Sequence, residues 1–221
     1  MNLDQARFNM VEQQIRPWGV LNQTILDAFR FLPREKFVPL DWQNLAFADL
    51  EIPIGYDESM MLPRIEARML QALAIQTTDQ CLEIGTGSGF VTACLAHLGQ
   101  HVDSVELHSD FSLQAETRLH AINVTNFDLY NDDASNGWQG MAGKLYDVVA
   151  VTGALPDYIP AFEQRLAPGG RLYITVGTSP IRQALLVQRD QDDHTIYHRK
   201  TLFETWLNPL VGAEKPPSFQ L

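Results

Sequence analysis

The sequence predicts an α/β fold, a doubly wound, mostly parallel sheet of seven strands preceded by an N-terminal helical extension. Two observations support this prediction. From about residue 77 onward, short apolar runs alternate with segments of helical periodicity, which is the pattern of βαβ units and therefore of parallel strands. A glycine-rich turn over 85–89 directly follows the first apolar run, which is typical of a parallel strand that ends at a ligand-binding edge.

The first third of the chain is expected to be helical. Apolar residues recur at helical spacing over 3–16 and 22–31, and Pro33 and Pro39 bracket an irregular link. A further helix is expected to begin at Pro63, because proline is favoured in the first helical turn. We therefore expect a helical extension and substrate loop over 1–76 and an α/β core over 77–221, together forming one compact domain.

The strands of the core are expected where apolar runs are bounded by turn residues. The five parallel candidates are 80–84, 102–107, 126–130, 146–151 and 171–176, with intervening helices near 88–98, 110–122 and 158–166. After Gly177, the segments 182–189 and 195–207 are expected to form a terminal antiparallel pair joined through RDQDDH.

Composition and charge limit the possible partners and location. The chain has 221 residues, 45% of them hydrophobic, and a formal net charge of −11. Nucleic acids and anionic membranes require a basic surface, so neither is expected as a partner. Two cysteines, Cys81 and Cys94, do not form a disulfide framework, and the N-terminus lacks the apolar segment of an export signal. No apolar run is as long as a membrane span, and a cytoplasmic location is the default expectation.

The glycine-rich turn indicates a pocket for S-adenosylmethionine. Glycine accepts positive φ and has no side chain, so the backbone can lie against a ligand. Glu106 closes the next apolar run, where a carboxylate can accept both hydroxyls of a ribose. The rival interpretations are a dinucleotide site and a purely structural turn. The spacing is G-x-G-x-G, however, and Phe90 stands where the dinucleotide motif has its third glycine.

The other candidate ligands fall at the same edge of the sheet. In open α/β sheets, ligands lie outside the carboxyl ends of the strands. The predicted cofactor-binding residues are Glu83, Gly85, Thr86, Gly87, Ser88, Gly89, Glu106, Asp133 and Thr152. No metal site is predicted, since Gly99 interrupts the helix between His97 and His101, and the pair at 194 and 198 falls on an expected strand.

Several short sequence motifs are distributed along the chain between about residue 8 and about residue 212. They are EQQI at 12–15, PREKFVP at 33–39, AFAD at 46–49, IPIG at 52–55, LEIGTGSGF at 82–90, Asp133 with Gly137-Trp138, YDVVAVTGA at 146–154 and LAPGGRL at 166–172. In these motifs the chain resembles the protein-L-isoaspartate O-methyltransferases. The resemblance implies S-adenosylmethionine as cofactor and methylation of the α-carboxylate of isoaspartyl residues in proteins or peptides, for protein repair. It also implies that Asp133 accepts the adenine amino group.

The substrate loop departs from the pattern of that family. The usual Gly-x-Gly-Gln-Thr-Ile-Ser-Gln-Pro aligns on 55–63, so Met61 stands where the family has a serine that places the substrate carboxylate. A thioether cannot donate a hydrogen bond, but Ser59 offers a hydroxyl two residues upstream. Ser59 and Met61 are therefore the candidate catalytic positions. Two alternatives follow: a methyltransferase with a different acceptor, or a catalytically inactive cofactor-binding module.

Overall fold

The computed structural model describes residues 2–213 of the chain. The N-terminal extension begins with α1 (Leu3–Asn9), a π-helical turn (Met10–Ile15) and a 3₁₀ turn (Arg16–Trp18). Asn2 caps α1, because its side-chain oxygen accepts hydrogen bonds from the amides of Asp4 and Gln5. The helix expected over 3–16 is therefore present, with a change of helical type inside it. Gly19, at φ 82°, ends the run.

The link between the extension and the core contains a β-hairpin where the sequence analysis expects a loop. After α2 (Gln23–Phe31), two 3₁₀ turns (Arg34–Lys36 and Leu40–Leu45) lead to β1 (Ile52–Gly55) and β2 (Glu58–Met60). The two strands pair antiparallel, and Tyr56 and Asp57 form the turn with φ of 52° and 60°. Neither residue gives the Asn-Gly or Asp-Gly signal of such turns, so the sequence did not predict this hairpin.

A seven-stranded sheet forms the core, as predicted. Its spatial order is β5-β4-β3-β6-β7-β8-β9, and all neighbours pair in parallel except β7 with β8 and β8 with β9. The strands are β3 (Gln80–Ile84), β4 (His101–Glu106), β5 (Phe127–Asn131), β6 (Tyr146–Leu155), β7 (Leu166–Val176), β8 (Arg182–Arg189) and β9 (Tyr197–Thr205). The order reverses between β3 and β6, which places a ligand crevice at their carboxyl ends.

The helices after the hairpin are α3 (Pro63–Leu73), α4 (Phe90–Leu98), α5 (Ser109–His120) and α6 (Pro160–Glu163). Pro63 begins α3, as predicted. The helix expected over 158–166 is wrong in length, because α6 has four residues. Leu166, which the helical pattern had assigned to the helix, is instead the first residue of β7 and pairs with Tyr146.

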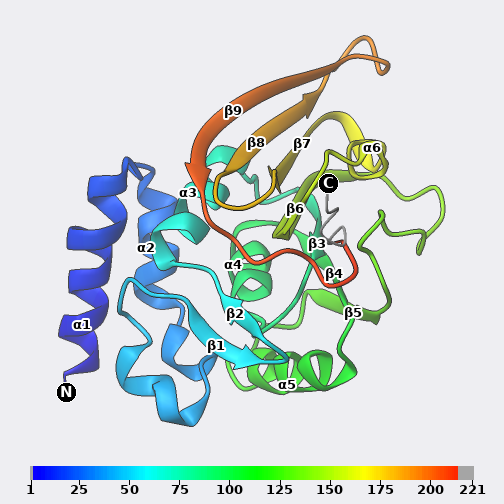
Figure 1. Cartoon of the computed structure of the whole chain (residues 1–221). Coiled ribbons are helices and arrows are strands. Elements are labelled where there is room, and N and C mark those ends of the chain that lie inside the picture. The colour runs from blue at the N-terminus through cyan, green and yellow to red at the C-terminus, as the bar shows by residue number, and fades with distance from the viewer. Residues whose placement is uncertain (1, 214–221) are drawn as a thin grey trace, which may run out of the picture.

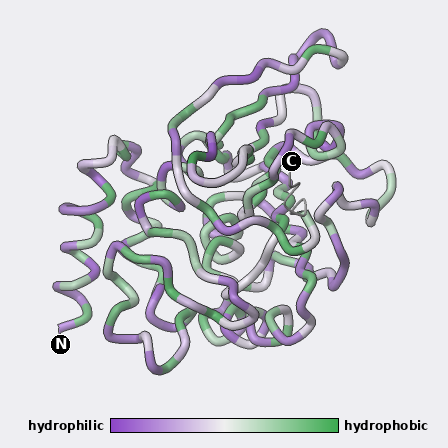
Figure 2. The backbone as a smooth tube through the Cα atoms, viewed as in Figure 1, coloured by the Kyte–Doolittle hydropathy of each residue, from purple (hydrophilic) through white to green (hydrophobic). Residues whose placement is uncertain are grey.

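Both faces of the sheet are buried. Successive strand residues point to opposite sides, so the residues of one strand pack alternately into two clusters. Val148 and Ala150 of β6 join the cluster that also holds α2, α3 and α4, whereas Val149 and Val151 join the cluster around Trp138 and Phe162. The first cluster includes Met10 and Leu26, so extension and core share one hydrophobic interior. The boundary between an extension at 1–76 and a core at 77–221 therefore stays a prediction. Figure 2 shows apolar residues along the central strands, while α1, which buries none of its residues, is mostly hydrophilic outside.

In the described part of the chain, no helix has both the length and the apolar character needed to cross a membrane.

Candidate functional site

A cleft lies at the carboxyl ends of β3, β4 and β6. It encloses about 890 Å³ of empty space, part of it open to solvent. Segments distant in sequence line it, among them the glycine-rich loop after β3, strand β2 with the residues that follow it, the residues after β4 and β5, and the segment 207–211. Figure 1 shows this last segment returning across the strand ends after β9. The cleft therefore lies where the rule for open α/β sheets places a ligand.

The glycine-rich loop depends on backbone conformations that favour glycine. Gly85, Gly87 and Gly89 have φ of 93°, 51° and 88°. A Cβ atom on Gly89 would lie 3.0 Å from the Cβ of Ala115, and one on Gly87 would lie 3.3 Å from Ile54 Cδ1. Phe90, the first residue of α4, is buried and packs edge-on against Phe29 and Phe37. The loop thus exposes backbone to the cleft while its last residue anchors it in the core.

Glu106 ends β4 at the wall of the cleft, as predicted. Its Oε2 accepts a hydrogen bond from the Gly87 amide (2.8 Å), and its Oε1 accepts one from the His108 amide (2.9 Å). Each carboxylate oxygen can accept a second hydrogen bond, so the group can still receive two ribose hydroxyls. The backbone cradle and this carboxylate fit the nucleoside part of S-adenosylmethionine.

Glu83 lies behind the loop and does not line the cleft, which differs from the direct contact that the sequence analysis expects. Its Oε2 accepts hydrogen bonds from Thr92 Oγ1 (2.5 Å) and Ser104 Oγ (2.6 Å), and Ser104 Oγ is 2.6 Å from Thr86 Oγ1. Complete burial, and less strongly the charge of Glu106, raises the pKa of Glu83 to about 8. Glu83 therefore connects the start of the loop to α4 from the interior.

The remaining predicted residues of the loop and of β6 have structural contacts beside the cleft. Thr86 and Ser88 line it, and Ser88 Oγ accepts a hydrogen bond from the Phe90 amide at 3.3 Å. Thr152 sits in an irregularity of β6, and its Oγ1 lies 2.9 Å from Ile84 O and 2.7 Å from Gly85 O. Since Thr152 has one hydroxyl proton to share between these carbonyls, its role is to hold β6 against the start of the loop.

Asp133 follows β5 and lines the cleft beside Asp132. Its Oδ1 accepts a hydrogen bond from the Ser135 amide (2.8 Å), which folds the turn, and Oδ2 has no hydrogen bond within the described residues. Trp138 does not line the cleft; it is buried in the cluster of Val149 and Phe162, and its indole donates to Asp132 Oδ2 at 3.0 Å. The indole ring is therefore part of the core and does not form the cleft surface.

The opposite wall is β2 and the residues after it. Ser59 and Met61 both line the cleft, and Ser59 Oγ accepts a hydrogen bond from Asn208 Nδ2 at 3.3 Å. Met61 is 6% exposed, and its carbonyl accepts a hydrogen bond from Arg34 at 3.0 Å. Glu58 also faces the cleft. Burial, then the charges of Glu106 and Asp57, raises the pKa of Glu58 to about 7.

Two features fix this wall. Arg34, fully buried, pairs with Glu66 of α3, donates to the carbonyls of Ala46 and Met61, and lies 4.7 Å from the centroid of the Phe90 ring. At the hairpin turn, Tyr56 stacks on His108 with ring centroids 4.1 Å apart. The β2 wall is thus tied both to the extension and to the residues that follow Glu106.

The segment 207–211 also lines the cleft and was not predicted from the sequence. Its backbone lies along β6, since the Ala154 amide donates to Asn208 O (2.8 Å) and the Leu210 amide donates to Ala154 O (2.9 Å). A Cβ on Gly153 would approach Leu210 Cδ2 to 2.5 Å. The short run WLNPL carries no periodic pattern, and the small residue at 153 was the one available signal of this close approach.

Comparisons with known proteins agree with this geometry. The family model for "Protein-L-isoaspartate(D-aspartate) O-methyltransferase (PCMT)" matches residues 6–215. A protein-L-isoaspartate O-methyltransferase of Koribacter versatilis is 37% identical over 212 residues, covering 96% of this chain and 92% of its own. Another, of Rhodopseudomonas palustris, is 34% identical and covers 93% of both chains.

Solved structures share the fold. One titled protein-L-isoaspartate O-methyltransferase superposes with a TM-score of 0.76 at 22% identity, covering 94% of this chain and 66% of its own. A Plasmodium falciparum protein, described as a putative enzyme of this type in complex with S-adenosyl-L-homocysteine, gives 0.79 at 15% identity, covering 95% and 98%. The chain belongs to the protein-L-isoaspartate(D-aspartate) O-methyltransferase family, and it is an S-adenosylmethionine-dependent O-methyltransferase.

Proposed function

We propose that the two walls of the cleft divide the reaction, with the glycine loop and Glu106 holding S-adenosylmethionine and the β2 wall holding the acceptor carboxylate. The observation that carries this proposal is the position of Ser59 in the same cleft as Glu106 and the loop, on the wall that faces them from β2. When bound, the cofactor supplies a methyl group activated by a sulfonium. A carboxylate acceptor is already ionised near pH 7, so the protein has to position and desolvate it rather than remove a proton.

On the cofactor wall, each proposed contact uses hydrogen-bonding capacity that the structure leaves unused. Glu106 has accepting capacity beyond the two amides it binds, and Asp133 Oδ2 is available to an adenine amino group. Gly85 and Gly87 let the backbone approach the ligand, while Thr86, Ser88, Gly89 and Thr152 shape the loop. We assign Glu83 a supporting role, because its carboxylate is buried behind Thr86.

On the acceptor wall, Ser59 is the proposed anchor for the substrate carboxylate. Its oxygen accepts from Asn208 Nδ2, so its own proton remains available to donate to an anion. Asn208 also donates to the Asp57 carbonyl at 3.3 Å, which fixes its amide and hence the direction of the serine hydroxyl. Met61 contributes an apolar surface that keeps water from the reacting atoms.

The partners follow from this acceptor. We propose that the enzyme acts on proteins and peptides carrying isoaspartyl residues, in the cytoplasm. Both cysteines are free and buried, which suits a reducing compartment. The strongly negative charge supports a protein substrate rather than a nucleic acid.

Transfer of a labelled methyl group tests the proposal. The wild type should methylate an isoaspartyl peptide and leave its aspartyl twin unlabelled, while Ser59→Ala should lose most of this transfer and still bind the cofactor. Equal labelling of the two peptides would contradict an isoaspartyl site. A Ser59→Ala enzyme as active as the wild type would place the anchor elsewhere.

A further inference from the structure

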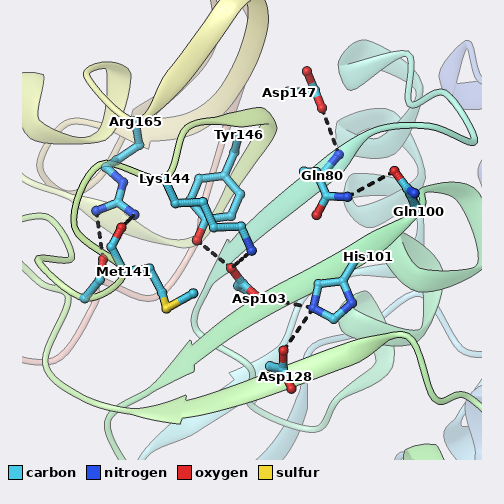
Figure 3. A network of polar contacts seen from close by, with 11 residues as sticks. Gln80, Gln100, His101, Asp103, Asp128, Met141, Lys144, Tyr146, Asp147 and Arg165 are labelled. Atoms are coloured by element: carbon cyan, nitrogen blue, oxygen red, sulfur yellow. Dashed lines mark hydrogen bonds and ion pairs between the residues drawn. The ribbon is translucent and has the colours of Figure 1, made fainter.

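A second polar cluster lies near the opposite end of β4 from the cleft. His101 opens this strand and Asp103 follows two residues later, so both side chains point to the same face of the sheet. Asp128 of β5 pairs directly with Asp103 in the parallel register, which puts it on that face as well. Figure 3 shows the three side chains directed toward one another, with Lys144 and Tyr146 on the far side of Asp103.

The spacing of their atoms is that of ligands around one ion. His101 Nε2 lies 3.3 Å from Asp103 Oδ1 and 3.2 Å from Asp128 Oδ2. One atom from each residue can be chosen so that all three lie within 4.8 Å of one another. Two ligands bound about 2.0–2.2 Å from a tetrahedral zinc ion are separated by roughly 3.3–3.5 Å. The cluster could thus accept an ion of this size with small side-chain adjustments.

Asp103 supplies a second, independent observation. Its side chain is fully buried, and Oδ2 accepts hydrogen bonds from Lys144 Nζ (2.5 Å) and Tyr146 Oη (2.6 Å). The other oxygen, Oδ1, is buried and accepts no hydrogen bond within the described residues. It is this oxygen that faces His101 Nε2. A buried carboxylate oxygen without a donor costs free energy, and a bound cation would remove that cost.

The contacts around Asp103 resemble the outer shell of a metal site. Groups that hydrogen-bond to a ligating carboxylate fix its orientation, and Lys144 and Tyr146 do this from the side opposite to His101. The competing arrangement has no ion and a hydrogen on His101 Nε2. That single N–H would then serve two carboxylates, although one hydrogen cannot make two well-directed bonds.

We propose that His101, Asp103 and Asp128 bind a divalent first-row transition ion of the zinc class, with the remaining coordination positions open to water. One imidazole and two carboxylates form a donor set that Zn²⁺ and Co²⁺ accept. The ion would link β4 to β5, the strand at one edge of the sheet, and would act through stability because the methyl-transfer cleft lies at the other strand ends. This inference is independent of the proposed roles of the cleft residues.

Titration of the metal-free full chain with Co²⁺, followed by visible absorption, tests the site. The wild type should bind one equivalent with the absorption bands of a low-coordinate ion, and Zn²⁺ should displace it. His101→Ala, at a partly exposed position, and Asp128→Asn, at an exposed one, should each weaken binding at least tenfold. Zn²⁺ should raise the melting temperature of the wild type and leave that of these variants unchanged.

His198→Ala is the matched control. His198 contacts Asp190 at 3.1 Å but belongs to no group of three potential ligands among the described residues, so its loss should not alter Co²⁺ binding. Unchanged binding of S-adenosylmethionine will show that each variant is folded. The proposal is wrong if the wild type takes up no Co²⁺, or if His101→Ala binds it as well as the wild type. Either result would leave the cluster as an ion-free contact of His101 with the two carboxylates.

Discussion

The two walls of the cleft are built in different ways. The cofactor wall comes from one continuous motif, Gly85 to Gly89, and from Glu106 on the neighbouring strand, and much of its ligand-facing surface is backbone. The acceptor wall combines a hairpin at 52–60, a buried arginine at 34 and an asparagine at 208. No two of these last three are close in sequence.

The two walls therefore differ in the amino-acid substitutions that they tolerate. The conformation of the cofactor wall limits which residues it can contain, because positive φ and close backbone approach favour glycine. The acceptor wall is fixed by side-chain contacts with distant partners, so a single position such as Met61 can change while the wall keeps its shape. The predictions below would confirm or contradict this contrast, beginning with the largest effect.

Gly87→Val should lower the affinity for S-adenosylmethionine by a factor of at least about 100. A branched side chain at φ 51° is strained, and its Cβ would lie 3.3 Å from Ile54. Isothermal calorimetry measures the loss. The matched control is Gly143→Val, which has a similarly positive φ of 81° but nothing within 4 Å of the added Cβ and no place in the cleft. Equal affinity in Gly87→Val and wild type would move the pocket elsewhere.

Glu106→Ala should weaken cofactor binding by about 1.5–3 kcal/mol, or roughly 10- to 150-fold, since hydrogen bonds to a charged group are lost. The amides of Gly87 and His108 would also lose their acceptor. Calorimetry again gives the affinity. Glu106→Gln keeps an acceptor and the shape, so it should lose less than Glu106→Ala. If both variants bind like the wild type, the carboxylate does not contact the ribose.

Ser59→Ala should lower kcat/KM for an isoaspartyl peptide about tenfold, which corresponds to roughly 1.4 kcal/mol, and leave cofactor affinity unchanged. Asn208→Ala should cause a smaller loss, because it releases the serine without removing it. Steady-state kinetics together with calorimetry separate the two walls. A fall in cofactor affinity in Ser59→Ala would show that the walls are not independent.

Met61→Ser should raise kcat/KM for the same peptide by up to about tenfold, since one hydroxyl donor is added beside the acceptor. It should also lower stability by about 1–3 kcal/mol, because a buried apolar side chain is replaced by a small polar one. Met61→Leu, which adds no donor, is the control for packing. Similar rates in both variants would indicate that Ser59 alone anchors the carboxylate.

The smallest effect concerns Glu58. Its pKa is raised to about 7, so it is largely neutral below pH 7 and ionised above. We expect kcat/KM for an anionic acceptor to fall a few-fold as pH rises through 7, because an ionised Glu58 repels the acceptor carboxylate. Glu58→Gln should flatten this part of the pH profile while its value at pH 6 stays near that of the wild type. A profile identical to that of the wild type would exclude Glu58 as the cause.

Prediction from sequence succeeded where local pattern and structure coincide and failed where a partner lay far away. The seven strands and the start of α3 at Pro63 follow from periodicity and turn residues. The helix expected over 158–166 is only the short α6, because Leu166 belongs to β7 and pairs with Tyr146. The hairpin that overlaps the loop aligned on 55–63 was not predicted, because its turn lacks the usual residues; stacking of Tyr56 on His108 holds the turn in place.

The sequence by itself determined the fold class and the family, because strand periodicity, the G-x-G-x-G turn and the acid that closes the next strand are all local patterns. Only the tertiary structure decided which atoms face the cleft. Glu83 lies in the same strand as the motif, yet its side chain points inward, to Ser104 and Thr92. Asn208 reaches Ser59 from 149 residues away. Such contacts depend on how distant elements pack against one another, and the free energy of that packing cannot be read from a local sequence pattern.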